Sequence, residues 1–287
     1  MAGSDRSAPG VPEASWESMV VVPSGDLGAV EDALKRDPGI AGMILEPTGA
    51  HYGQLPFDVA SYLTGLRQLT DHYGVVLIFD EVVTGFRASP GGVQERYGIK
   101  PDLTTMAKIV AGALPGGAVG GKSDIVDMIS HRGDHEWDSQ HRVYHPGTFN
   151  ANPLSAAAGA TCLELIASQP LNLHADAMAE RLKAGLNEIF GKMEFAGHAY
   201  GISSMVHFVL ADCGCDREIC TMPHSEIKRA IALPSVSELK LGLQNQGVDI
   251  MGRDAFLVSA THTEAEIDKT LEVFESTLVA VRADGAP

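Results

Sequence analysis

The feature that most constrains the fold is a short apolar run that ends in two acids. Residues 75–79 read Val-Val-Leu-Ile-Phe, follow Gly74, and are followed at once by Asp80 and Glu81. An unbroken run of branched and aromatic residues is typical of a strand buried on both faces of a parallel sheet. Carboxylates at the tip of such a strand are costly unless a partner compensates for the lost water. Because open α/β sheets bind ligands at the carboxyl ends of their strands, this tip is a candidate site.

A lysine lies further along the chain in apolar, glycine-rich surroundings. Lys108 is part of residues 104–117, TTMAKIVAGALPGG. We expect a lysine with such neighbours to be poorly solvated, which favours its neutral, nucleophilic amine. A strand-tip acid and a desolvated lysine suit pyridoxal phosphate, since the lysine forms a Schiff base and the acid keeps the pyridine nitrogen protonated. The alternative is that the acids only begin a loop and that the lysine is solvated.

Four motifs in order resemble the class III aminotransferases, which are fold-type I pyridoxal phosphate enzymes. They are residues 77–87 (LIFDEVVTGFR), 101–103 (PDL), 108–121 (KIVAGALPGGAVGG) and 145–153 (HPGTFNANP). The branch that looks most similar is glutamate-1-semialdehyde aminomutase and the transaminases related to it. The resemblance runs from about Trp16 to about Leu278. It implies an α/β fold: a large domain with a mostly parallel sheet and helices on both faces, and a small α+β domain at the C-terminus.

The resemblance also implies roles for individual residues. Lys108 would carry the cofactor and then move a proton, Asp80 would pair with the pyridinium nitrogen, and Val82 would pack on one ring face. Thr148 matches a residue that reaches the phosphate in the neighbouring subunit, so a homodimer or higher oligomer with the site at its interface is expected. Glu46 matches a structural acid. The reaction would transfer an amino group from a small-molecule donor to a carbonyl acceptor, or, in an aminomutase, within one carbon skeleton.

The chain departs from the family pattern at its start. Family members have a long segment before the strand expected at Met19, and this segment supplies the cradle for the cofactor phosphate. Ser24, Gly25 and Asp26 lie at a helix start, but Asp26 would place an anion where the phosphate belongs, so we reject them. We therefore expect an N-terminally truncated large domain. It could be a natural minimal form, a gene fragment, half of a two-chain enzyme, or a non-catalytic dimerising remnant.

Other sequence features limit the substrate and the partners. Residues 259–262 (SATH) lack the arginine that many α-amino acid transaminases carry after this strand, so the choice of substrate stays open. The formal net charge of −16 argues against partners such as nucleic acid and anionic membrane surfaces. The first 17 residues lack the apolar core of a signal peptide, and no apolar run reaches transmembrane length, which favours the cytoplasm.

The cysteines and histidines raise the question of a metal. Cys213, Cys215 and Cys220 lie close together in sequence and His224 follows them, whereas Cys162 is distant. The paired C-x-x-C spacing of zinc sites is absent, so we expect free thiols and no metal. The histidines of residues 130–144 have irregular spacing, which favours a solvated loop over a metal site.

Periodicity and turn residues divide the chain into three parts. We expect an extended arm over 1–17, a partial cofactor-binding large domain over 18–168, and a linker helix with a small C-terminal domain over 169–287. The expected strands are 19–23, 41–45, 75–79, 102–107, 117–121, 203–210 and 256–259. The expected helices are 26–35, 57–73, 123–129, 152–167, 171–193, 235–247, and a last one capped by Thr263 and Glu266. Residues 130–144 are expected to form a long active-site loop.

Overall fold

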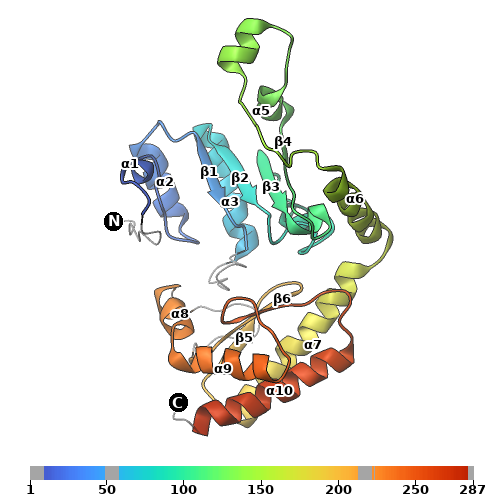
Figure 1. Cartoon of the computed structure of the whole chain (residues 1–287). Coiled ribbons are helices and arrows are strands. Elements are labelled where there is room, and N and C mark those ends of the chain that lie inside the picture. Colours follow the sequence, from blue (N-terminus) through green and yellow to red (C-terminus); the bar gives the residue numbers. More distant parts are fainter. Residues whose placement is uncertain (1–9, 49–57, 213–221, 223, 284–287) are drawn as a thin grey trace.

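The computed structural model describes residues 10–48, 58–212, 222 and 224–283. They form an N-terminal unit from α1 to α6 and a C-terminal unit from α7 to α10 (Figure 1). The N-terminal sheet has the order β1 (Gly42–Leu45), β2 (Val76–Asp80), β3 (Leu103–Ala107) and β4 (Gly117–Gly121). The first three strands are parallel, and β4 runs antiparallel to β3. The mostly parallel α/β sheet predicted from the apolar runs is therefore confirmed.

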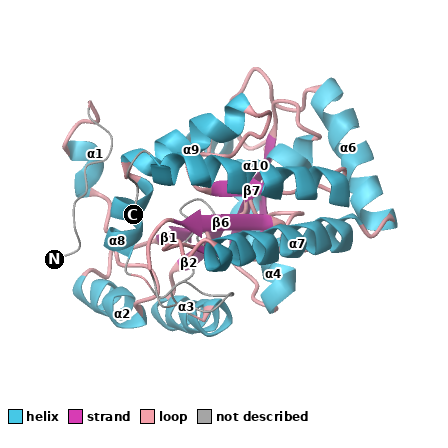
Figure 2. Cartoon of the chain, turned by 90° about the horizontal axis from the view of Figure 1, so that it is seen from below, coloured by secondary structure: helices cyan, strands magenta, loops and turns pink. Residues whose placement is uncertain are grey.

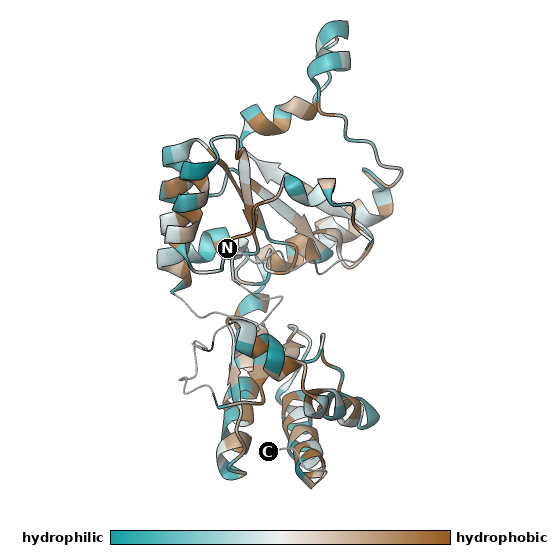
Figure 3. Ribbon diagram, turned by 90° about the vertical axis from the view of Figure 1, so that its left-hand side faces the viewer, coloured by the Kyte–Doolittle hydropathy of each residue, from teal (hydrophilic) through white to brown (hydrophobic). Residues whose placement is uncertain are grey.

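Helices α2 (Leu27–Arg36), α3 (Val59–Tyr73) and α4 (Gly92–Tyr97) supply the N-terminal core. Leu63 and Leu66 of α3 are fully buried in one cluster with Leu77 and Phe79 of β2. Gly74 ends α3 in the left-handed conformation, with φ of 68°, as its position in the sequence predicts. Figure 3 shows the apolar strands of this sheet and the helices beside them, which alternate between polar and apolar ribbon.

The other face of the same sheet is open. Its residues alternate with those of the core, because successive side chains of a strand point to opposite faces. Ile44 on β1 is 59% exposed and Val119 on β4 is 55% exposed. The sequence predicts helices on both faces, but within the described ranges the helices cover only the face that carries Leu77 and Phe79.

A long excursion separates β4 from α6 (Pro153–Ser168). It contains α5 (Ser123–Val126), a 3₁₀ turn at Asp127–Ile129 and a π-helical turn at Trp137–His141. Figure 1 shows that it extends away from the sheet before the chain returns to α6. The loop expected over 130–144 thus contains one helical turn.

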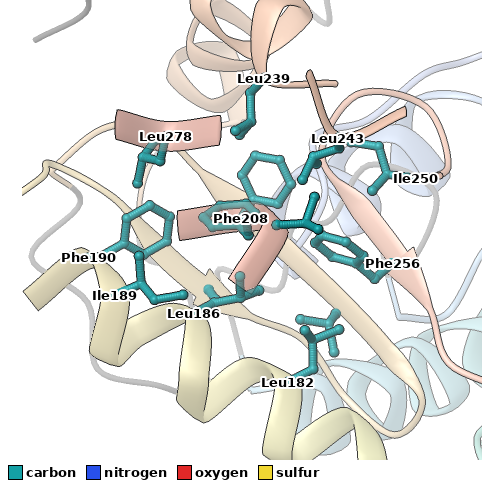
Figure 4. Packing of buried hydrophobic residues seen from close by; sticks show 14 of the residues in the cluster. Leu182, Leu186, Ile189, Phe190, Phe208, Leu239, Leu243, Ile250, Phe256 and Leu278 are labelled. Carbon is teal, nitrogen blue, oxygen red and sulfur yellow. The ribbon is translucent and has the colours of Figure 1, made fainter. Parts of the chain in front are cut away.

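The C-terminal unit is built on an antiparallel sheet of β5 (His198–Tyr200), β6 (Met205–Val209) and β7 (Ala255–Leu257). Its helices are α7 (Leu171–Lys192), α8 (His224–Ile231), α9 (Pro234–Asn245) and α10 (Glu264–Ala283). Figure 2 shows α7, α9 and α10 lying along β6 and β7. The core between them holds Phe190, Phe208 and Phe256, which Figure 4 labels. The ring of Phe274 meets the rings of all three.

Several local predictions are corrected or confirmed. Residues 14–17 form the short helix α1 inside the expected arm, and residues 19–23 form no strand. Met19, Val20 and Val21 are 60%, 48% and 55% exposed, so this apolar stretch is not packed as a buried strand would be. The capping box is confirmed, because the Thr263 amide donates to Glu266 Oε2 at 2.7 Å. Strand β5 and helix α8 were not predicted.

Candidate active site

Asp80 is the last residue of β2 and lies on the open face of the sheet. Its neighbour across the ladder is Thr105 of β3. Oδ1 of Asp80 accepts a hydrogen bond from the amide of Val82 at 3.1 Å and one from the Thr105 hydroxyl at 3.4 Å. Its other oxygen, Oδ2, accepts no hydrogen bond within the part of the chain that the structure describes. The carboxylate is therefore held in orientation and still has an oxygen available for a ligand.

Glu81, the second acid of the strand tip, has a structural partner. It is 1% exposed, and its carboxylate accepts from the Val93 amide at 2.7 Å and the Gln94 amide at 3.3 Å, which are the first free amides of α4. Thr84 donates to the same carboxylate at 3.2 Å. Gly92 has φ of +75°, and a Cβ there would lie 2.2 Å from Glu81 Oε2. The cost of burying this charge is thus offset by an N-terminal cap.

Lys108 follows β3 directly and opens the 3₁₀ turn η1 (Lys108–Ala111). Its φ of 55° is in the left-handed region, which is unfavourable for a residue other than glycine and is frequent at functional sites. The sequence predicts a poorly solvated lysine, but Lys108 is exposed in this chain. That expectation is wrong for the chain alone because the small residues around Lys108 do not cover its side chain.

Helix α6 holds the Lys108 turn in place through contacts at the backbone. A Cβ on Gly159 of α6 would lie 2.3 Å from the carbonyl oxygen of Val110, and one on Gly112 would lie 2.6 Å from the Ala158 carbonyl carbon. Ser155 Oγ donates to the Pro115 carbonyl at 2.7 Å. Only glycine permits such a close approach, so the glycines of the lysine motif have a packing role.

Of the four predicted site residues, the structure brings Asp80 and Lys108 to the same end of the sheet. Asp80 ends β2 and pairs with Thr105 of β3, and Lys108 follows Thr105 by three residues, so the acid and the lysine both lie at the carboxyl ends of neighbouring strands. Val82 is partly buried beside Asp80. Thr148 is exposed in the segment that leads into α6, and no described contact joins it to Asp80 or Lys108.

Other candidate residues have local roles. Glu46 Oε1 accepts from the amide and the hydroxyl of Thr48, at 3.0 and 2.8 Å. Asp26 caps the start of α2 by accepting a hydrogen bond from the Ala29 amide at 2.8 Å. Its carboxylate thus takes the place that a bound phosphate would need, as the sequence predicts. Sequence reasoning missed Thr105, although two threonines just before the lysine were visible, and it missed Arg87, whose partners lie in the C-terminal unit.

No metal centre is found among the described residues. Within the described ranges, no group of three or more His, Cys, Asp or Glu side chains could hold an ion. Cys162 is a free, partly buried thiol. The sequence cluster of Cys213, Cys215 and Cys220 lies outside the described residues.

Comparisons with known proteins agree with the motifs. The family model described as aminotransferase class-III matches residues 9–224. The chain is 34% identical over 268 residues to glutamate-1-semialdehyde 2,1-aminomutase 2 of Brevibacillus brevis, covering 92% of this chain and 59% of that protein. An omega-transaminase from Sphaerobacter thermophilus superposes with a TM-score of 0.82 at 28% identity, covering 96% of this chain and 60% of that one.

A further solved structure, a transaminase with PLP bound, superposes with a TM-score of 0.81 at 25% identity. That match covers 98% of this chain and 62% of the transaminase. The chain therefore spans about three fifths of the length of the relatives that it matches.

Proposed function

Because the chain belongs to the aminotransferase class-III family, we propose that it acts as a pyridoxal phosphate-dependent aminotransferase. The observation that carries this proposal is the pairing of Asp80 and Thr105 at the sheet edge from which Lys108 projects. We assign cofactor binding to residues 18–168 and the closing small domain to residues 169–287. The small-molecule partners would be an amino donor and a carbonyl acceptor.

The residues present fit pyridoxal phosphate. Oδ1 of Asp80 accepts hydrogen bonds from Val82 and Thr105, which leaves Oδ2 able to accept one from the protonated ring nitrogen. Lys108 is exposed, so its amine is accessible to the cofactor's aldehyde. When bound, the cofactor supplies an electron sink for the substrate's α-carbon electrons.

Each residue then has a defined task. Asp80 would keep the ring nitrogen protonated, because a carboxylate beside that nitrogen favours its charged form. Lys108 would hold the cofactor through its amine, and the free amine would serve as the base that moves a proton between carbon atoms. Val82, beside Asp80, would pack on one face of the ring.

We also propose a homodimer or higher oligomer in which Thr148 reaches the cofactor phosphate of the neighbouring subunit. The segment around Thr148 presents large exposed apolar side chains: Val143, Tyr144, Phe149 and Leu154 are 53%, 75%, 70% and 68% exposed. Several large exposed apolar side chains in one segment are typical of a protein interface. Light scattering that finds only a monomer with tightly bound cofactor would contradict this arrangement.

A second candidate is isomerisation of the aminomutase type. It is favoured by the 34% identity to a glutamate-1-semialdehyde 2,1-aminomutase. The two candidates differ in their second substrate: an aminotransferase needs a separate carbonyl acceptor, whereas an aminomutase needs none. Turnover of glutamate-1-semialdehyde without an added acceptor would favour the aminomutase. A non-catalytic remnant of the fold would bind no cofactor at all.

We propose that the protein is cytoplasmic. Within the described ranges, no helix combines the length and the apolar character that a bilayer crossing requires. The net charge of −16 further supports small-molecule partners over nucleic acid.

The deciding experiment is covalent mapping of the cofactor. Pyridoxal phosphate is added to the full chain, the complex is reduced with borohydride, and peptides are mapped by mass. We expect absorption in the near-visible and the added mass on Lys108. Lys108→Ala should lose both, whereas the control Lys100→Ala, an exposed lysine before β3, should keep both. Labelling of a different lysine, or of none, would refute the proposal.

A further inference from the structure

The loop that follows Asp80 is a series of hydrogen-bonded turns. The Gly85 amide donates to the Glu81 carbonyl at 2.9 Å, and the Arg87 amide donates to the Thr84 carbonyl at 3.1 Å. A Cβ on Gly85 would lie 2.7 Å from the Glu81 carbonyl oxygen, so the first turn needs a glycine. Since the turns overlap, hydrogen bonds connect Arg87 to the strand tip without a break.

The side chain of Arg87 crosses to the C-terminal unit. Its Nη1 donates to Ser204 Oγ at 3.0 Å and to the Val258 carbonyl at 3.3 Å. The contact is buried, since Ser204 is 3% exposed. Burial lowers the pKa of the Arg87 guanidinium, and the charge of Asp176 opposes that shift. A buried cation is costly without its acceptors, so Arg87 favours the docked C-terminal unit.

The C-terminal unit also binds the backbone of the same residue. Asn172 Nδ2 of α7 donates to the carbonyls of Phe86 and Arg87, at 2.9 and 3.0 Å. The Ser203 hydroxyl lies 2.9 Å from the Arg87 carbonyl and 2.5 Å from Asp176 Oδ1. Phe86 and Ser203 have φ of 59° and 51°, a strained conformation for residues other than glycine that persists only where contacts impose it.

An apolar contact accompanies these polar ones. Ile202, next to Ser203 in the turn between β5 and β6, packs against the N-terminal core cluster that includes Phe79. Phe79 directly precedes Asp80. The β5–β6 turn therefore touches the loop at Arg87 and the core beneath the strand tip.

We propose that Arg87 is a positioning residue: it couples docking of the C-terminal unit to the geometry of Asp80 and Val82. The inference rests on the proposed function for what those two residues bind. Without the Arg87 contacts, the loop from Glu81 to Phe86 loses its outer support, and the cofactor-binding end of β2 opens more often. The C-terminal unit is thereby part of the site although it supplies none of the predicted cofactor ligands.

The test uses three variants of the full chain. Arg87→Met removes the charged donor, Arg87→Lys keeps the charge without the planar fork, and Arg96→Met is the matched control. Arg96 Nη1 donates to the Ala88 carbonyl of the same loop at 3.1 Å, within the N-terminal unit. Hydrogen exchange of residues 80–86 and 198–210 is measured first without cofactor, followed by the affinity for pyridoxal phosphate and the pH dependence of its absorption.

We expect Arg87→Met to accelerate exchange over 80–86 on the order of tenfold, as loss of a hydrogen bond to a charged group implies. Cofactor affinity should fall about as much, and the pH at which the absorption changes should shift, with Arg87→Lys intermediate and Arg96→Met unchanged. If Arg87→Met unfolds globally, Ser204→Ala, which removes one acceptor, should give a smaller change in the same peptide.

Acceleration confined to 198–210, or equal in Arg96→Met, would overturn the coupling. The two proposals fail separately: wild-type protein that binds no pyridoxal phosphate refutes the proposed function, while the exchange data from cofactor-free protein still decide whether Arg87 supports the strand tip.

Discussion

The two sheets of this protein are stabilised in opposite ways. The C-terminal sheet has a large apolar core on one face, centred on aromatic rings, and a smaller cluster around Tyr200 and Ile227 on the other. All five residues of β6 are buried. The N-terminal sheet has only one covered face within the described ranges. Two acids at its strand ends, Glu81 and Asp102, are buried, and each accepts several hydrogen bonds.

Some buried polar groups of the C-terminal unit, in contrast, lack hydrogen-bond partners among the described residues. Both ring nitrogens of the fully buried His207 and Oδ2 of Asp254 have no hydrogen-bond partner among the described residues. Packing there is extensive enough to retain unsatisfied groups that would cost about 1–3 kcal/mol each. The N-terminal unit also has buried atoms without a described partner, such as Arg67 Nε, but they belong to side chains that form hydrogen bonds through their other polar atoms. Apolar packing therefore dominates in the C-terminal unit, whereas hydrogen bonds to buried carboxylates are prominent in the unit that carries the predicted site.

The largest effect is expected from removing an aromatic ring of the C-terminal core. Phe274 is 0% exposed and meets Phe190 and Phe208 edge-on. Phe274→Ala should lower the free energy of unfolding by about 4 kcal/mol, because it leaves a cavity. Ile44→Ala on the open N-terminal face should cost less than about 1 kcal/mol. Urea titration, followed by hydrogen exchange in each of the two units, measures the loss of stability in both variants. Equal losses would contradict the difference between the two sheets.

The buried acid beneath the N-terminal sheet should give the next largest effect. Asp102 accepts from the Leu77 amide at 2.7 Å and Arg67 Nη1 at 2.9 Å, and it pairs with Lys122 at 2.5 Å. Asp102→Asn should cost about 3 kcal/mol, since it leaves buried donors and a cation poorly compensated. The control Asp71→Asn affects an exposed partner of the same arginine and should be nearly neutral.

The pH dependence of Asp102 has a definite sign. Burial raises the pKa of this carboxyl, but the hydrogen bonds from Lys122, Leu77 and Arg67 outweigh it and hold the pKa below 3.8. The stabilisation is therefore present above that value and is lost as the pH falls further. Asp102→Asn should abolish this part of the acid dependence, and a variant with unchanged acid sensitivity would contradict the assignment.

The buried histidine should make the C-terminal unit sensitive to mild acid. Burial lowers the pKa of His207 from 6.5 to about 4. The unfolded chain takes up a proton below about 6.5 and the folded chain does not, so stability should fall by about 3 kcal/mol between pH 6.5 and pH 4. His207→Phe should remove this dependence. His131→Gln, whose side chain is 72% exposed, should retain it.

The smallest predicted effect has the opposite sign. Burial raises the pKa of Asp254 from 3.8 to about 6. The folded state therefore favours the protonated acid, and the charged form destabilises the protein as the pH rises through that range. Asp254→Asn should raise the free energy of unfolding by about 2 kcal/mol at pH 7.5 and leave it nearly unchanged at pH 4. Destabilisation at pH 7.5 would contradict this assignment and would show that the backbone hydrogen bonds of Arg253 and Asp254 to the carboxylate outweigh its burial.

Much of the N-terminal sheet could be predicted because its signals are local. The apolar run before Asp80 and the glycine after α3 specify a buried strand and a helix end without reference to distant residues. The capping box of Thr263 and Glu266 likewise depends only on residues close together in sequence. The membership in a family of transaminases followed from four motifs in order.

What could not be predicted depends on distant neighbours. The exposure of Lys108 depends on what covers it, which its flanking residues do not specify. Strand β5 has three residues and owes its existence to pairing with β6. The role of Arg87 arises from Asn172, Ser204 and Val258, all far along the chain. No local pattern encodes such contacts.

The contact between the Lys108 turn and α6 has a consequence for synthesis of the protein. Because Gly159 meets the backbone at Val110, the turn gains its support only after α6 has been made. Strands β1 to β3 precede it and can pair earlier, since chains fold in order from the N-terminus as they emerge. Lys108, the predicted cofactor lysine, would then be among the last parts of its own unit to be fixed, after the sheet that presents Asp80 has assembled.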